Sequence, residues 1–238
     1  MSAANPAVLS DVVRGLFPPG AVAAELREPG DPSWLLPAEA ACLSSAAVEK
    51  RRREFAAGRL CARRAMAEVG VHDFALQVGE DRQPLWPDSL VGSITHTGGL
   101  CAAVVAPKAS LAAIGLDSEV VGSVVPEVWP TICVAQELSW LDSLPAAERA
   151  AAVTLIFSVK EAFYKCQYPL TAEWLNFEDV RVQPLEWGAT VGAVLIHANR
   201  GLKLQEWAAL PMMGQYVFHE QFVTAGVALS RLYRRAGP

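Results

Sequence analysis

Apolar and polar positions follow a helical spacing in the segment that precedes Gly70. This segment, residues 37–69, is rich in Ala, Glu, Lys and Arg, and the glycine after it is a common helix terminator. Its apolar positions recur at spacings of seven, four and three residues, which places them on one face. The pattern predicts one long amphipathic helix whose apolar stripe consists of Phe55, Ala62, Met66 and Val69.

A second helix and several strands are predicted further along the chain. Residues 146–167 have a helical composition, with Pro145 just before them and Pro169 just after them. Short apolar runs bounded by turn formers are typical of strands. Such runs predict strands at residues 100–106, 111–120 and 190–197, and late strands within residues 215–230.

Turn-forming residues interrupt this pattern in three places. The first ~35 residues repeat Pro and Gly, which favours an irregular lead-in with room for only short elements. Residues 79–87 are too rich in turn formers to be regular. The segment that follows, GSITHTGG at residues 92–99, is expected to form a loop.

The order of these elements indicates the fold class. Helix, loop, strands, helix and strands succeed one another, with a possible midpoint near residues 107–110. Each half would then hold one long helix and an antiparallel sheet. We therefore expect an α+β protein of two similar halves, residues 1–109 and 110–238, although no repeat is visible in the sequence itself.

Composition excludes several classes of protein. The chain has 20 Lys and Arg against 25 Asp and Glu, a net charge of −5, which excludes a generally basic nucleic-acid binder. With 52% apolar and 19% charged residues it is expected to bury a core rather than to be disordered. No apolar run approaches the ~18 residues that cross a bilayer, and no secretory leader is recognisable, so a soluble, cytoplasmic protein is expected. Its five cysteines are scattered without a CxxC pair and are interpreted as small core residues.

Residues 49–64 reverse the sign of the charge locally. Seven basic and two acidic residues give these 16 positions a charge of +5. Arg52, Arg59 and Arg63 are spaced seven and four apart, so they would line one helix face, where guanidinium groups can grip phosphate oxygens. A solvated face with i,i+4 ion pairs explains the same pattern.

The segment at residues 92–99 could also contact a phosphate. Its glycines and hydroxyls offer many N–H and O–H donors around His96, although this histidine could equally be structural. The usual signatures of other sites do not occur: the sequence contains no Walker loop, GxGxxG, HExxH or GxSxG motif. Common nucleotide folds, a catalytic zinc and an α/β-type serine hydrolase are therefore not expected.

Two pairs of charged residues complete the candidate chemistry. Asp117 and Glu119 follow an apolar strand two residues apart, so both carboxylates point to one side, where they could hold Mg²⁺ or simply be exposed acids. Glu161 and Lys165 are four residues apart and share a helix face, which a plain ion pair explains equally well.

Taken together and in this order, these features resemble the 4′-phosphopantetheinyl transferase family, in its larger enterobactin-synthase or surfactin-synthase type, which acts on carrier proteins of siderophore and other secondary-metabolite synthases. The family pattern consists of an Arg-rich EF-x-x-x-R helix, an R-x-P-x-WP turn, a GS-[IL]-[ST]-H loop, a G-[IL]-D-x-E strand end and a [FW]S-x-KE-A-x-[FY]-K helix. The match spans about 115 residues. It comprises Arg51–Arg59, Arg82–Pro87, Gly92–His96, Gly115–Glu119 and Phe157–Lys165.

The resemblance implies a fold and a reaction. The fold is a single-chain pseudo-dimer of two α+β halves, hence a monomer, with coenzyme A in the cleft between the halves and Mg²⁺, or Mn²⁺, on its pyrophosphate. The reaction is that of a holo-[acyl-carrier-protein] synthase. The phosphopantetheine arm of coenzyme A passes to a serine of an apo carrier protein or carrier domain of a fatty-acid, polyketide or nonribosomal peptide synthase, and adenosine 3′,5′-bisphosphate is released.

The resemblance also assigns roles to charged residues in the second half. Asp117, Glu119 and Glu161 look like the metal ligands. Glu161, directly or through a water, is a candidate base for the serine proton, and Glu137 is an alternative. Asp117, Glu161 and Lys165 are thus the expected catalytic group.

By the same resemblance, basic and hydroxyl side chains contact the phosphates of coenzyme A. Arg51, Arg59 and Arg82 would contact the 3′-phosphate and neighbouring groups, and Arg52 competes with Arg51 for this role on helical spacing. The other implied phosphate contacts are Thr95, His96, Lys160 and Lys165.

Two other functions fit part of the same pattern. A metal-dependent hydrolase of coenzyme A or a related pyrophosphate would use the same carboxylates with water as the acceptor. A binding module would hold coenzyme A without turnover, but the three intact acids favour an enzyme.

Overall fold

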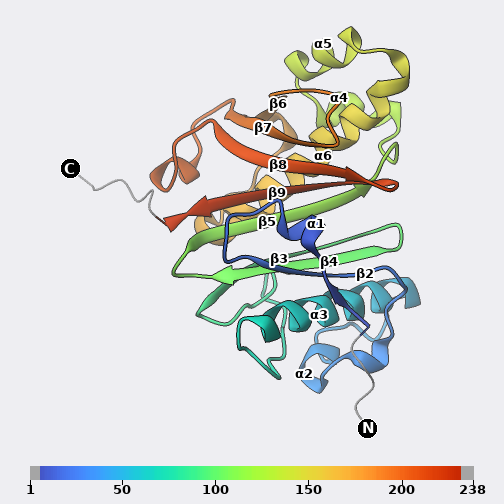
Figure 1. The fold of residues 1–238 in the computed structure, drawn as a ribbon, viewed down its shortest axis with the longest axis vertical. Coiled ribbons are helices and arrows are strands. Elements are labelled where there is room, and N and C mark those ends of the chain that lie inside the picture. Colours follow the sequence, from blue (N-terminus) through green and yellow to red (C-terminus); the bar gives the residue numbers. More distant parts are fainter. Residues whose placement is uncertain (1–5, 232–238) are drawn as a thin grey trace, which may run out of the picture. The chain divides into compact units, whose positions relative to one another are not determined.

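The computed structural model describes residues 6–231 of the chain, which divide between Leu111 and Ala112 into two compact units. We call these unit 1 and unit 2 and describe each by itself (Figure 1). The expected boundary, between residues 109 and 110, lies two residues earlier. Helices and antiparallel sheets occur in both units, so the α+β class is confirmed.

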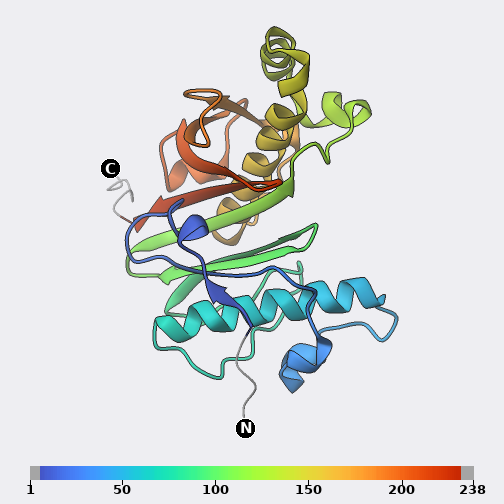
Figure 2. The same ribbon diagram turned by 45° about the vertical axis from the view of Figure 1, so that its right-hand side comes forward.

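Unit 1 consists of a four-stranded sheet and one long helix, α3, which lies along the sheet (Figure 2). The strand order is β1-β2-β4-β3, with antiparallel neighbours. The strands are β1 (Val8–Leu9), β2 (Val22–Leu26), β3 (Leu90–Thr97) and β4 (Leu100–Pro107). The helices are α1 (Asp11–Arg14), η1 (Pro32–Trp34), α2 (Pro37–Ala40) and α3 (Glu49–Glu68).

The helix expected over residues 37–69 is in fact two helices. α2 ends at Ala40 and α3 begins at Glu49, so the prediction of one continuous helix is wrong. Ser44 accepts a hydrogen bond from the Ala46 N–H, which favours a turn over a helix at this point. From Phe55 onward the prediction holds: Phe55, Ala62 and Met66 of the predicted stripe are buried, and Ala62 and Met66 belong to the hydrophobic core of unit 1.

One further expectation in unit 1 is wrong, and a second, that of an irregular lead-in with only short elements, holds in part. Residues 92–99 are not a loop, because β3 pairs with β4 over its whole length and only Gly98 and Gly99 form the turn of the hairpin, with φ of 36° and 94°. The β-branched side chains of Ile94 and Thr95 suit this strand. Within the lead-in, β2 is a regular strand that pairs with β4. The partner of β3 directly follows it in the sequence, whereas the partner of β2 is distant, since Val22 pairs with Val105.

Unit 2 consists of a five-stranded sheet and the long helix α6 (Ala146–Thr171), with strand order β5-β9-β8-β7-β6. The strands expected at 111–120, at 190–197 and within 215–230 are confirmed, the last as a hairpin. The strands are β5 (Leu111–Val120), β6 (Val180–Pro184), β7 (Val191–Ala198), β8 (Met212–His219) and β9 (Phe222–Ser230). The shorter helices are η2 (Pro126–Val128), α4 (Trp129–Ile132), α5 (Ala135–Ser143), η3 (Phe177–Asp179) and η4 (Lys203–Glu206).

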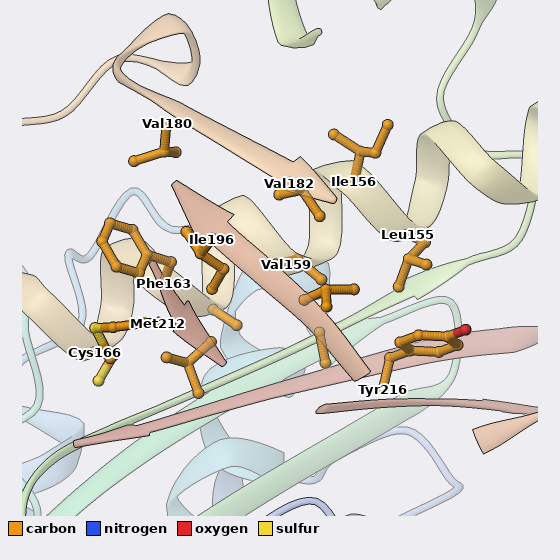
Figure 3. Close-up of a cluster of buried hydrophobic side chains, with 14 of the residues drawn as sticks. Leu155, Ile156, Val159, Phe163, Cys166, Val180, Val182, Ile196, Met212 and Tyr216 are labelled. Atoms are coloured by element: carbon orange, nitrogen blue, oxygen red, sulfur yellow. The ribbon is translucent and has the colours of Figure 1, made fainter. Parts of the chain in front are cut away.

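One face of α6 supplies much of the core of unit 2 (Figure 3). The helix runs four residues beyond the expected end at Gln167 and contains Pro169, which was expected to follow it. It ends at Thr171, and the residue that caps it, Ala172, has a left-handed φ of 48°. Its buried residues Leu155, Ile156, Val159, Phe163 and Cys166 face Val180, Val182, Ile196, Met212 and Tyr216 of the sheet.

Two general expectations concern the whole chain. All five cysteines are free, and four of them are buried, as expected of small core residues. Among residues 6–231, no helix combines the length and the apolar character needed to span a bilayer.

Candidate functional site

The cationic face of unit 1 is built on the first turns of α3 and the end of β3. Arg51 and His96 are both exposed, and Arg51 Nη1 lies 3.3 Å from His96 Nε2. A guanidinium and an imidazole side by side offer several N–H donors to an anion. The structure thus brings together two of the expected phosphate contacts that are 45 residues apart in sequence.

Arg59 is buried in the same unit, with an exposed fraction of 6%. Its Nε donates to the Leu76 carbonyl at 2.8 Å, and its Cζ lies 4.0 Å from the centre of the Phe55 ring. Burial lowers the pKa of Arg59 to about 10, so it remains protonated at neutral pH. Its orientation is therefore held by a hydrogen bond and by ring stacking rather than by an acidic partner.

The other two arginines of the predicted face serve the fold. Arg52 donates to the carbonyls of Ser45 and Ala47 at 2.9 Å each, which holds the turn ahead of α3. Arg63 pairs with the buried Glu39 carboxylate and also donates to the Trp34 carbonyl. Between the two competing residues at the start of the helix, it is Arg51 that lies beside His96.

The other two residues of unit 1 that were expected to contact a phosphate are Arg82 and Thr95. Arg82 is exposed in the turn that the Val78–Pro84 bridge closes, and its φ is 66°. Thr95 is buried, whereas the next residue, His96, is exposed, because successive side chains of a strand point to opposite faces. These two side chains therefore do not face the same phosphate.

The acidic site of unit 2 depends on a close approach of β5 to α6 at Gly115. A Cβ at this position would lie 1.9 Å from the Ala162 carbonyl oxygen, so only glycine allows the contact. The approach places Asp117 next to the helix. Lys165 Nζ donates to Asp117 Oδ1 at 2.7 Å and to the Leu116 carbonyl at 3.3 Å.

Glu161 completes this acidic site one helical turn before Lys165. Burial raises the pKa of Glu161, the charge of Lys165 opposes that rise, and the charge of Asp117 adds to it. Asp117, Glu161 and Lys165 therefore interact electrostatically. Glu119 is half-buried on β5, on the same face as Asp117 by strand alternation, while Ser118 between them donates to or accepts from Thr224 Oγ1 at 2.8 Å on the other face.

The carboxylates of this site are suitable ligands for a hard cation, but the structure does not bring them close enough together to bind one. Carboxylate oxygens are the ligands that Mg²⁺ and Mn²⁺ prefer. Within residues 6–231, however, no three His, Cys, Asp or Glu side chains are grouped closely enough to hold a metal ion. The ammonium group of Lys165 lies where a cation would neutralise Asp117. The residues fit a metal in chemistry, and Lys165 competes with it for Asp117.

Lys160 differs from the expectation that it contacts a phosphate. Its side chain is buried, and its Nζ donates to the Ile132 carbonyl, to Glu137 Oε2 and to the Phe177 carbonyl at 2.8, 2.8 and 2.9 Å. An ammonium group has three donors, and all three are used. The lysine therefore ties α6 to α5 and to the segment before β6.

Glu137, the alternative base, belongs to the same buried arrangement. Besides Lys160, its Oε2 accepts from the Val134 N–H at 2.8 Å, and its Oε1 accepts from the Val182 N–H at 2.6 Å. Both oxygens are thus engaged, and the residue is 2% exposed. This geometry favours a structural role for Glu137.

A cavity of about 500 Å³ in unit 2 borders the acidic site, and the sequence analysis did not anticipate it. Its wall includes four aromatic residues and Glu161. The only sequence signal was a group of aromatic residues on and just after α6, which core packing explained equally well. The lining residues are Thr131, Lys160, Glu161, Phe163, Tyr164, Trp174, Leu175, Asn176, Phe177, Glu178 and Val180.

Two family descriptions match the chain, one in each unit. Residues 38–106 match the 4′-phosphopantetheinyl transferase N-terminal domain. Residues 113–217 match the 4′-phosphopantetheinyl transferase superfamily. All five motifs that carried the resemblance lie within these two ranges.

Curated relatives agree with this family. The chain is 38% identical over 171 residues to 4′-phosphopantetheinyl transferase Npt of Nocardia iowensis, covering 72% of this chain and 76% of the relative. It is 37% identical over 154 residues to PptT of Mycobacterium tuberculosis, covering 64% and 67%. Enterobactin synthase component D of Escherichia coli K12 is 34% identical over 164 residues, covering 68% and 73%.

Members of this family transfer the phosphopantetheine arm of coenzyme A to carrier proteins, and neither the hydrolase nor the binding module is favoured. The chain belongs to the 4′-phosphopantetheinyl transferase family, in its secondary-metabolite type.

Proposed function

We propose that this chain transfers 4′-phosphopantetheine from coenzyme A to a serine hydroxyl of an apo carrier protein in a reaction that requires Mg²⁺. One observation carries the proposal: Glu161 belongs both to the acidic site with Asp117 and Lys165 and to the wall of the 500 Å³ cavity. The proposed site for the reacting phosphate and the proposed site for the group attached to it thus share a residue.

The proposed place of the arm is this cavity. Its volume lies within the range of about 300–1,000 Å³ that is typical of small-molecule sites. The phosphopantetheine arm is uncharged beyond its phosphate and combines apolar carbons with two amides, which suits a wall that contains both aromatic residues and polar ones such as Asn176. With the phosphate end near Glu161, the arm would extend between Tyr164 and Phe177.

The proposed metal ligands are Asp117, Glu119 and Glu161. The ion would neutralise the developing charge on the pyrophosphate, as metal ions do in phosphoryl transfer. Lys165 adds a mobile positive charge beside Asp117, and its ammonium group can move to a phosphate oxygen when the carboxylate binds a cation. The same carboxylates can accept Mn²⁺.

The adenosine end of coenzyme A is assigned to unit 1. Arg51 and His96 present exposed donors suited to the 3′-phosphate, and Arg59 behind them adds a fixed positive charge. Arg82, exposed in its turn, is the fourth candidate. An arginine fork is the preferred protein partner for a phosphate dianion.

The proposed chemistry needs one proton transfer. The serine oxygen forms a bond to the β-phosphorus, the bond between that phosphorus and the bridging oxygen breaks, and adenosine 3′,5′-bisphosphate leaves. The serine proton goes to Glu161, directly or through a water, because burial raises the pKa of Glu161 and makes its carboxylate a better base. Glu137 is not proposed for this step, since both its oxygens are engaged.

Intact-mass spectrometry tests the proposal. An apo carrier protein is incubated with this chain, coenzyme A and Mg²⁺, beside a control with EDTA. We expect a mass gain of one phosphopantetheine that EDTA abolishes. Consumption of coenzyme A without a mass gain on any carrier type would favour hydrolysis instead, and binding without consumption would favour a binding module.

A further inference from the structure

One wall of the cavity is a single irregular segment, residues 172–179, between α6 and β6. It contributes five of the eleven lining residues, Trp174 to Glu178. The segment begins at the left-handed Ala172 and ends in the short helix η3. Because no sheet or long helix holds these residues, the shape of the cavity depends on what fixes the two ends of the segment.

Arg200, in the connection after β7, joins both ends. Its Nε and Nη2 donate to Asp179 Oδ1 and Oδ2 at 2.7 and 3.0 Å, and its Nη1 donates to Glu173 Oε1 at 2.8 Å. A planar guanidinium that makes a two-point contact with one carboxylate and a third contact with another constrains direction as well as distance. The two acids are the last residues before and after the five that line the cavity.

Both carboxylates also accept hydrogen bonds from backbone N–H groups, so Arg200 constrains the backbone as well as the two side chains. Glu173 Oε2 accepts from the Lys203 N–H at 2.8 Å, and Asp179 Oδ2 accepts from the Asn176 N–H at 2.8 Å, within the wall itself. The Glu173 and Asp179 side chains are only 13% and 11% exposed. Without Arg200, two largely buried negative charges would remain at the ends of the segment, and water would have to enter to solvate them.

We propose that Arg200 is a positioning residue for the phosphopantetheine arm: by clamping Glu173 and Asp179 it fixes the wall of the cavity against which the arm packs. This inference rests on the proposed function, in which the cavity takes the arm. Arg200 does not line the cavity, so its effect would pass through the segment it holds.

Binding of two ligands to the full chain tests this role. Coenzyme A carries the arm, whereas adenosine 3′,5′-bisphosphate has the same nucleotide without it. Isothermal titration calorimetry measures both dissociation constants for the wild type, for Arg200→Met and for Arg181→Met. Arg181, on β6 of the same unit, is a matched control because its one described hydrogen bond goes to Gln183 at 3.4 Å.

We expect Arg200→Met to weaken coenzyme A binding roughly tenfold, the scale of losing a well-formed charged hydrogen-bond pair, and to leave bisphosphate binding within about twofold. Arg181→Met should change neither constant. A merely structural role for Arg200 would weaken both ligands alike or neither. If Arg200→Met folds poorly, Arg200→Lys replaces it in the test, because lysine keeps the positive charge but lacks the forked guanidinium group. We expect this variant to lose less affinity for coenzyme A and none for the bisphosphate.

The outcomes separate this inference from the proposed function. If the wild type prefers coenzyme A and both Arg200 variants keep that preference, the positioning role is wrong and the place of the arm stands. If the wild type binds the two ligands equally, the cavity does not hold the arm, and both proposals are overturned.

Discussion

Asp117 interacts with the two other charged residues of the acidic site, Glu161 and Lys165. It is 4% exposed, accepts a hydrogen bond from Lys165 and contributes to the raised pKa of Glu161. Asp117→Asn keeps the shape and removes the charge. We expect transfer to fall roughly 100-fold or more, the effect of removing one group that stabilises a reacting charge, as measured by the rate of carrier mass gain.

A matched control for this change is Asp142→Asn. The side chain of Asp142 is 81% exposed, and its ion pair with Arg149 is long, at 3.4 Å. We expect this variant to retain full activity, and both variants to melt within a few degrees of the wild type. Undiminished transfer by Asp117→Asn at saturating Mg²⁺ would refute the metal role of Asp117.

Arg51 is the exposed arginine of α3 for which the structure of residues 6–231 shows no acidic partner. Arg53, two residues further along, is also exposed but pairs with Glu49 at 2.8 Å. Arg51→Ala should therefore raise the KM for coenzyme A roughly tenfold with little change in kcat, since one charge-assisted contact to a phosphate is lost. Arg53→Ala is the control and should leave the KM unchanged. Equal KM values for the two variants would mean that Arg51 is merely a solvated surface residue.

At the scale of elements, the Lys160–Glu137 pair joins α6 to α5 and to β6. Both side chains are 1% exposed, so removing one partner leaves a buried charge. Lys160→Met should lower the free energy of unfolding by about 3–5 kcal/mol, and Glu137→Gln by a similar amount. The double variant should lose less than the sum, because neither charge is then left unpaired.

Urea unfolding of the four proteins measures this coupling, and the KM for coenzyme A distinguishes the two roles of Lys160. A variant Lys160→Met that is as stable as the wild type yet binds coenzyme A poorly would show that this lysine contacts a phosphate after all. The structure instead predicts that loss of stability is the primary effect.

The contact between Arg200 and Asp179 predicts how the free energy of unfolding depends on pH. Hydrogen bonds from Arg200 lower the pKa of Asp179 below its ordinary value. A lowered pKa means that the ionised group stabilises the fold fully above the unfolded pKa, about 3.9, and progressively less as pH falls through the folded pKa. The difference in unfolding free energy between the wild type and Asp179→Asn should thus be constant from about pH 6 to 7 and shrink below about pH 4.

Urea titrations of both proteins across this range measure that difference. Asp142→Asn is again the control, because an exposed acid should give a difference near zero at every pH. A difference that grew on acidification would contradict the direction of the pKa change.

At the scale of the whole molecule, the elements that the sequence predicted well are those with long, uninterrupted patterns. α6 was expected from its helical composition, and β4, β5, β8 and β9 were expected from apolar runs that are bounded by turn formers. β2, β3 and β6 were missed or misread. β3 contains a glycine and three hydroxyl residues, and β2 and β6 are only five residues long, so no local pattern marks them; they are strands because β4 and β7 pair with them.

The candidate site follows the same division. The motifs identified the family and the acids Asp117, Glu119 and Glu161, since spacing along one strand and one helix is a local property. The sequence could not show which arginines have a structural role, because Arg51, Arg52 and Arg63 have the same chemistry. Only their partners in the structure, His96, Ser45 and Glu39 respectively, distinguish them.

The sequence by itself determined the family of the chain, because the motifs of the family are short and their order can be read directly from the sequence. Tertiary structure alone decided that Lys160 is buried against Glu137, that a cavity opens beside Glu161, and that Arg200 holds the wall of that cavity. Burial, cavities and clamps arise from residues far apart in the chain, and a contact over such a distance has no periodicity or motif that a single sequence could display.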